Sequence, residues 1–262
     1  MTHSDFISLL CLGAQRKGMV INMKECFNTT TKKIMLLINA AVIIFIFVMN
    51  FFYQSNGFDF TLKCVCSISF AVLGLINLYY AFATKQKNVS FYVGMAAGLV
   101  LAMLGDILIK VDFIIGAAVF AAGHIFFIAA YCLFSRLCLK DVIFSGILFA
   151  GGASFLLFCP LLNFSVPVFR VICVVYALII SVMLGKAIGN FIKSRNLFTG
   201  TVAFAALLFF ISDLMLVFDR FIGLWDWTGH VCMGTYYPAL CLLALSMLIK
   251  ACCVRDEKGE KA

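Results

Sequence analysis

Charged residues are scarce in this chain. Asp, Glu, Lys and Arg make up 12% of its 262 residues, and 64% of the residues are hydrophobic, whereas ordinary soluble domains contain about a quarter charged residues. This composition excludes a soluble globular domain. The net charge of +8 does not indicate nucleic acid as a partner, because in a membrane protein the positions of Lys and Arg record how the chain crosses the bilayer.

Histidine is scarce as well. The chain has three histidines, and His3 lies in a polar N-terminal stretch, so a zinc site with three His ligands cannot be assembled inside the membrane. GxSxG, P-loop and HExxH motifs are absent from the sequence. Carboxylates and two histidines remain for acid and base chemistry, and we expect neither a metal nor an organic cofactor.

Long apolar runs fill most of the chain. A bilayer core about 30 Å thick takes roughly 20 residues per helix, and the three prolines with few alternating polar positions argue against a β-barrel. We predict an all-α, polytopic membrane protein with a tail at 1–32, a membrane domain at 33–250 and a second tail at 251–262. Its eight transmembrane helices are expected near 33–53, 62–83, 90–110, 114–136, 141–160, 166–188, 197–218 and 229–249.

The basic residues predict a topology. Most of them fall in the two tails and in the second, fourth and sixth connections, whereas the other side has only Lys63, Lys110, Arg170 and Arg220. The positive-inside rule therefore places both termini in the cytoplasm, and an even number of helices agrees with that placement.

Two stretches of the chain resemble each other. The pattern Gly105-Asp106, followed by Asp112, recurs as Ser212-Asp213, followed by Asp219, and the next helix of each half carries a Gly-His pair with a tyrosine seven residues after the histidine. We predict a parallel internal repeat of two four-helix halves, related by an axis along the membrane normal.

Asp106 and Asp213 are the main catalytic candidates. Each lies about five residues, roughly 8 Å, from the non-cytoplasmic end of its predicted helix, where a carboxyl group is costly and often functional. The repeat predicts that the two face each other across one cavity. For Asp106, a structural hydrogen bond or a pair with Lys110 is the alternative.

Further polar side chains accompany the pair. His124 and His230 are each followed by a tyrosine on the same helix face, and each His can act in the site or serve as a core hydrogen-bonding residue. Two arginines on the side of the carboxyls can bind a phosphate headgroup or anchor the helix at the interface. The candidate substrate-binding residues are Tyr131, His230, Tyr237, Arg170 and Arg220.

Three segments resemble signatures of the YhhN-like lysoplasmalogenase family. They are Leu104–Leu108, Gly116 to His124 with Tyr131 after it, and Phe209–Leu214, and the likeness covers roughly residues 60–250. Thr235-Tyr236-Tyr237 resembles a further family segment, although Leu240 stands where the family commonly has glutamine.

This resemblance implies hydrolysis of the vinyl ether bond of a lysoplasmalogen by water, which gives a fatty aldehyde and a glycerophospho headgroup. Asp106 and Asp213 would share the acid and base roles, with His124 as the third catalytic residue and lysophospholipid and membrane lipids as partners. The implied location is the endoplasmic reticulum membrane in a eukaryote or the inner membrane in a bacterium. The alternative is a small-molecule or proton-coupled carrier, since a parallel repeat around an acidic cavity also suits transport.

Overall fold

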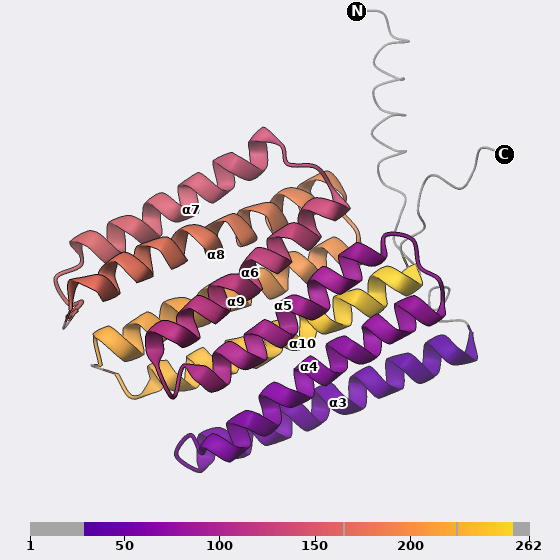
Figure 1. Ribbon diagram of the computed structural model, residues 1–262, viewed down its shortest axis with the longest axis horizontal. Coiled ribbons are helices and arrows are strands. Elements are labelled where there is room, and N and C mark those ends of the chain that lie inside the picture. Colours follow the sequence, from indigo (N-terminus) through magenta and orange to yellow (C-terminus); the bar gives the residue numbers. More distant parts are fainter. Residues whose placement is uncertain (1–28, 165, 224, 254–262) are drawn as a thin grey trace, which may run out of the picture.

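The computed structural model describes residues 29–164, 166–223 and 225–253. This part of the chain forms eight helices, each long and apolar enough to cross a membrane, and no strand. The protein is therefore a multi-pass helical membrane protein, as predicted. Its helices, labelled as in Figure 1, are α3 (Thr30–Ser55), α4 (Phe60–Ala83), α5 (Val89–Leu108), α6 (Phe113–Phe134), α7 (Leu139–Phe158), α8 (Pro167–Lys193), α9 (Leu197–Phe221) and α10 (Trp227–Cys253).

Polar residues at the connections explain where several helices begin. The carboxylates of Asp59 and Asp112 accept hydrogen bonds from the backbone N–H of Leu62 and of Ile115 at the starts of α4 and α6, and Pro167 occupies the first turn of α8. These are ordinary N-terminal helix signals. Asp112 therefore caps a helix.

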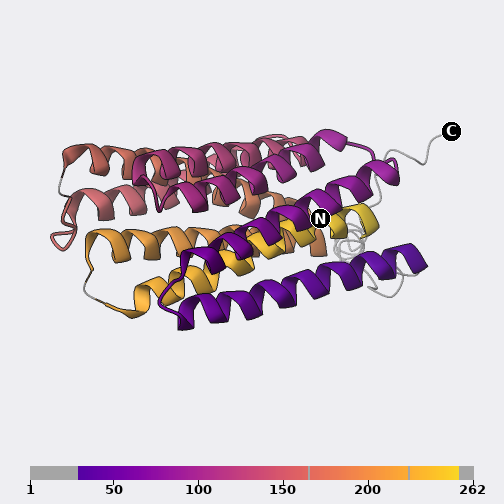
Figure 2. The same cartoon turned by 60° about the horizontal axis from the view of Figure 1, so that its bottom comes forward.

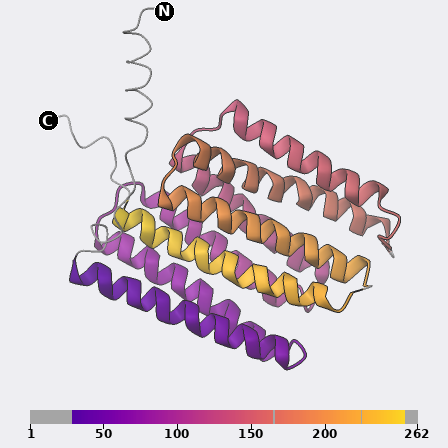
Figure 3. The same cartoon turned by 180° about the vertical axis from the view of Figure 1, so that it is seen from behind.

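The helices run along a common direction, with α7 at one edge of the bundle and α3 at the other (Figures 1, 2 and 3). Helix α5 packs on α6 and α9 packs on α10, while α6 also contacts α8 and α10 also contacts α4. Helix α10 is the most buried span, and α7, which packs on α8, is the least buried. The helix contacts within the two halves are similar, since α5 packs on α6 as α9 packs on α10. The internal repeat itself stays a prediction.

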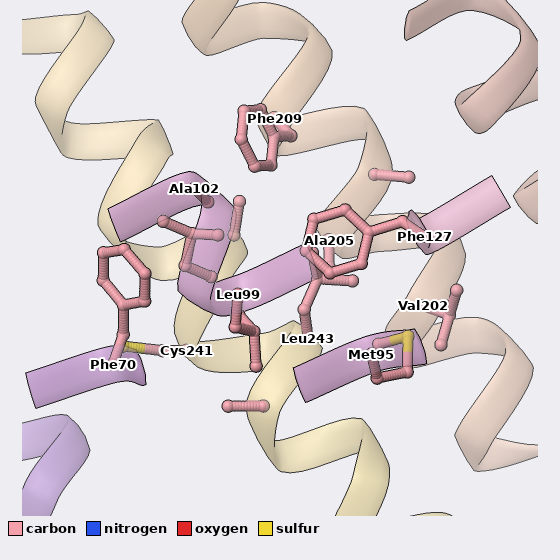
Figure 4. Packing of buried hydrophobic residues seen from close by; sticks show 14 of the residues in the cluster. Phe70, Met95, Leu99, Ala102, Phe127, Val202, Ala205, Phe209, Cys241 and Leu243 are labelled. Carbon is pink, nitrogen blue, oxygen red and sulfur yellow. The ribbon is translucent and has the colours of Figure 1, made fainter. Parts of the chain in front are cut away.

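Glycines set the close packing of α5 against α6. A Cβ on Gly98 would lie 2.5 Å from a ring carbon of Phe127, and one on Gly105 would lie 2.8 Å from the ring of Phe120. Only glycine leaves room for these rings. Figure 4 shows Phe127 in the core between α5 and α9, with Leu99, Ala102 and Phe209 nearby.

Both described ends of the chain lie at the same end of the bundle (Figure 1). The ammonium of Lys32 donates a hydrogen bond of 3.3 Å to the backbone carbonyl of Cys252 there. Most of the predicted N-terminal tail and nearly all of the predicted C-terminal tail lie outside the described residues. That this end of the bundle faces the cytoplasm stays a prediction from the charge pattern.

Candidate active site

Side chains from two other helices contact Asp213 of α9. The hydroxyl of Tyr176 on α8 donates a hydrogen bond of 3.0 Å to Asp213 Oδ2. His124 Nε2 on α6 lies 3.5 Å from the same oxygen and 3.4 Å from the tyrosine hydroxyl. The other carboxyl oxygen, Oδ1, has no hydrogen-bond partner among the described residues. We call Asp213, His124 and Tyr176 the Asp213 cluster.

The position of His124 determines which of its nitrogens carries hydrogen. Nδ1 lies 2.9 Å from the backbone carbonyl oxygen of Phe120, and because a carbonyl can only accept, Nδ1 is the donor. The ring is buried, 1% exposed, and Phe209 packs edge-on against it at 4.6 Å between centroids. Nε2 therefore faces Asp213 Oδ2 and the hydroxyl of Tyr176.

A cavity of about 90 Å³ opens beside the Asp213 cluster, between α6, α7, α8 and α9. Asp213 is the only charged residue in its lining, and Tyr176 and Ser181 are its other polar side chains apart from one thiol. The hydroxyl of Ser181 is buried without a hydrogen-bond partner among the described residues. The remaining lining is apolar and includes Ile109, Phe113, Phe120, Phe155, Leu156, Cys173, Ile180, Phe210 and Val217. The site can hold an apolar chain with a reactive group beside a carboxyl.

Asp106 lies in a different cluster, near the end of α5. Its Oδ1 is 2.8 Å from Lys63 Nζ, and both side chains are 3% exposed. Its Oδ2 accepts hydrogen bonds from the hydroxyls of Ser67 and, at 3.3 Å, Tyr237. We call Asp106, Lys63, Ser67 and Tyr237 the Asp106 cluster. It joins α4, α5 and α10.

The expectation that Asp106 and Asp213 face each other across one cavity is wrong. The cavity is lined by Asp213 and not by Asp106, and among the described residues the two carboxyls share no hydrogen-bond partner. Aromatic rings connect the clusters: Phe209 contacts His124 on one side and Tyr236 on the other, and Tyr236 packs against Tyr237. The α5–α10 and α9–α10 contacts place the last helix between the two acidic residues.

The expected position of each carboxyl, about five residues from the end of its helix, is also wrong. Helix α5 ends at Leu108, so Asp106 lies in its last turn. Helix α9 continues to Phe221, about two turns beyond Asp213. The predicted span ends at 218, before the charged residues Asp219 and Arg220, whereas in the structure both belong to α9.

Comparison with known proteins identifies the family of this chain. The profile of the YhhN family matches residues 58–247, which run from the end of the α3–α4 connection into the last turns of α10. The chain belongs to the YhhN family. This family contains lysoplasmalogenases, and comparisons with curated proteins and with solved structures find no match.

The YhhN match spans both clusters, but three of the predicted substrate-binding residues lie away from the Asp213 cluster. The hydroxyl of Tyr131 is buried without a partner in the described part of the chain, while its carbonyl accepts a bond from Asn190. His230 Nδ1 lies 2.9 Å from Gln54 Oε1, in a separate polar pocket between α3 and α10. Tyr237 belongs to the Asp106 cluster.

The two candidate arginines of this YhhN protein both lie over aromatic rings. The guanidinium of Arg170 is 5.1 Å from the centroid of Phe164, and that of Arg220 is 5.7 Å from the centroid of Phe113. Phe113 lines the cavity, whereas Phe164 and Arg170 line a separate hollow at the outer face of α8.

Sequence reasoning missed Lys63 and Tyr176. The charge pattern places Lys63 among the basic residues at the non-cytoplasmic side of the membrane, but its side chain is buried, at 2% exposure. Lys63 lies near the start of α4, opposite the end of α5. Antiparallel neighbouring helices bring those ends together, so the sequence did contain a signal for this contact. Tyr176 gave no such signal, since nothing in the sequence of α8 tells which face turns toward α9.

Proposed function

We propose that this YhhN protein hydrolyses the vinyl ether bond of lysoplasmalogens, with the Asp213 cluster as its catalytic centre. The observation that carries the proposal is the placement of a carboxyl in contact with a histidine in the wall of an otherwise apolar cavity. The alkenyl chain occupies the apolar part of the cavity, and the ether linkage lies beside Asp213.

The first step is transfer of a proton from the Asp213–His124 pair. Asp213 Oδ1, which has no other partner, faces the substrate, while Oδ2 is held by Tyr176 and His124. The π electrons of the alkene form a new C–H bond at the carbon remote from the ether oxygen. The result is an oxocarbenium ion, whose positive charge is stabilised by the carboxylate left behind.

The second step is attack of water on the oxocarbenium carbon. A C–O bond forms, and the Asp213–His124 pair takes up the proton that the water loses, so that the pair returns to its starting state. The hemiacetal then breaks its bond to the glycerol oxygen while its hydroxyl proton passes to that oxygen, which gives the fatty aldehyde and the glycerophospho alcohol. One group that acts first as acid and then as base is sufficient for this sequence.

The size of the cavity limits what it takes. Binding sites for small molecules commonly enclose about 300–1,000 Å³, whereas this cavity measures about 90 Å³. It receives the reacting bond and the first carbons of the chain, while the rest of the chain lies among lipid tails. Asp106, paired with Lys63, stabilises the helix packing and has no part in the proton transfer.

The test incubates the purified protein with lysoplasmalogen in detergent. Mass spectrometry then measures the aldehyde that is released. D213N and H124Q should each lower kcat by at least about a hundredfold, because they remove the proton carrier or its partner. D219N is the matched control: Asp219 lies on the same helix, but its carboxylate accepts a hydrogen bond from Thr228 away from the cavity. Wild-type turnover by D213N would overturn the proposal, and a carrier would form no aldehyde.

A further inference from the structure

Arg220 lies on the same stripe of α9 as the catalytic carboxyl. Asp213 and Val217 line the cavity, and Arg220 follows at the next helical step on that face. Its guanidinium lies over the ring of Phe113, 5.7 Å from the centroid, and Phe113 is itself a wall of the cavity. The positive charge therefore lies beside a wall residue of the cavity, in the last turn of the helix.

The charge of Arg220 is not neutralised within the described part of the protein. The ion pairs there are Lys63–Asp106, His124–Asp213 and Lys186–Asp141. The neighbouring acid, Asp219, accepts a hydrogen bond from Thr228 of α10. Arg220 is exposed, and its planar guanidinium matches the geometry of a phosphate group.

From these contacts we infer that Arg220 binds the phosphate of the lysophospholipid while Asp213 acts on its ether bond. This inference rests on the proposed function and identifies how the same site recognises its substrate. The phosphate then lies at the end of the bundle opposite to both described chain ends (Figure 1), and the alkenyl chain extends into the cavity from there.

The spacing along α9 fits such a substrate. Asp213 and Arg220 are separated by about 10 Å along the helix axis at 1.5 Å per residue. In a lysoplasmalogen, about seven bonds separate the alkene carbon that takes the proton from the phosphorus, and they extend to about 8 Å at roughly 1.2 Å per bond. One molecule can therefore reach both side chains.

Arg170 does not meet the same conditions. The hollow that it lines with Phe164 is formed by Val171, Val174 and Val175 of α8. The cavity is lined from the same helix by Ile172, Cys173 and Tyr176. Ala177 and Ser181 of α8 also line the cavity, on the same stripe as Arg170. The difference lies in the ring beneath each guanidinium: Phe164, under Arg170, does not line the cavity, so a phosphate at Arg170 would not lie beside a cavity wall.

The test compares two substrates with the same alkenyl chain, an alkenyl-glycerophosphocholine and an alkenylglycerol without phosphate. R220Q should lower kcat/KM for the phosphate substrate by about tenfold to a hundredfold through KM, with a much smaller loss for the alkenylglycerol. R220K should recover part of the loss, since it restores charge but not the planar fork. R136Q, at the opposite end of the bundle, is the matched control.

Two results would overturn the inference: equal losses on both substrates in R220Q, or a phosphate-selective loss in R170Q instead. A second readout is independent of turnover. An alkyl-glycerophosphocholine, which lacks the reactive double bond, should raise the Tm of the wild type more than that of R220Q. If the wild type hydrolyses neither substrate but shows this difference, the proposed reaction fails and the phosphate site stands; with no difference, the site fails as well.

Discussion

The imidazole of His124 and the carboxyl of Asp213 approach to 3.5 Å across the interior of the bundle, and Tyr176 contacts both. Because His124 Nδ1 donates to the carbonyl of Phe120, it is Nε2 that faces the carboxyl and the hydroxyl of Tyr176. In the proposed reaction, this arrangement lets Asp213 act as proton donor and acceptor.

Removal of the Tyr176 hydroxyl tests how Asp213 is positioned. Y176F deletes the donor that holds Oδ2, so the carboxyl loses one constraint on its orientation. We expect kcat to fall about tenfold with little change in KM, as for a lost hydrogen bond to a charged group.

The matched control for this change is Y131F. It removes a buried hydroxyl that has no partner in the described part of the chain, so neither activity nor Tm should fall. Equal kcat values for Y176F and the wild type would show that the tyrosine does not position the carboxyl.

The Asp106 cluster predicts a stability effect. K63M leaves the carboxylate of Asp106 buried without its cation, and breaking a buried ion pair in this way costs about 3–5 kcal/mol. The Tm of the purified protein, followed by intrinsic fluorescence, should fall clearly.

The double variant K63M/D106N separates charge from packing. It removes the uncompensated charge, and the asparagine can still contact Ser67 and Tyr237, so the Tm should recover much of the loss seen in K63M. A double variant as unstable as K63M would show that packing of the lysine, rather than its charge, stabilises the bundle.

Filling the cavity from α7 tests where the alkenyl chain lies. Gly152 lines the cavity, and a Cβ there meets Ala177 at an ordinary 3.9 Å. G152L should therefore keep or raise the Tm, since a better helix former replaces glycine, while aldehyde release falls at least about tenfold.

G146L provides the comparison on the same helix. A Cβ on Gly146 has no atom within 4 Å among those described, and this glycine does not line the cavity. The same gain in helix propensity should leave its activity unchanged. If both leucine variants keep wild-type activity, the chain does not occupy this cavity.

The helices could be predicted from the sequence because a membrane span needs only length and apolar character, and both are properties of a continuous segment. The predicted span 62–83 and helix α4, Phe60–Ala83, differ by only two residues at one end. Asp106, Asp213 and His124 could be singled out for the same reason, since a polar residue in an apolar run is visible in one dimension.

A bundle of eight membrane-crossing helices, and the polar residues inside it, follow from the amino-acid sequence alone. The packing of the helices is what brings Asp213 to His124 and Tyr176 beside a cavity and pairs Asp106 with Lys63 in another cluster. The physical reason is that lipid tails and protein interiors are equally apolar, so a helix face turned toward its neighbours has no distinct hydrophobic pattern. Which faces meet is settled by packing, such as the fit of Phe127 against Gly98.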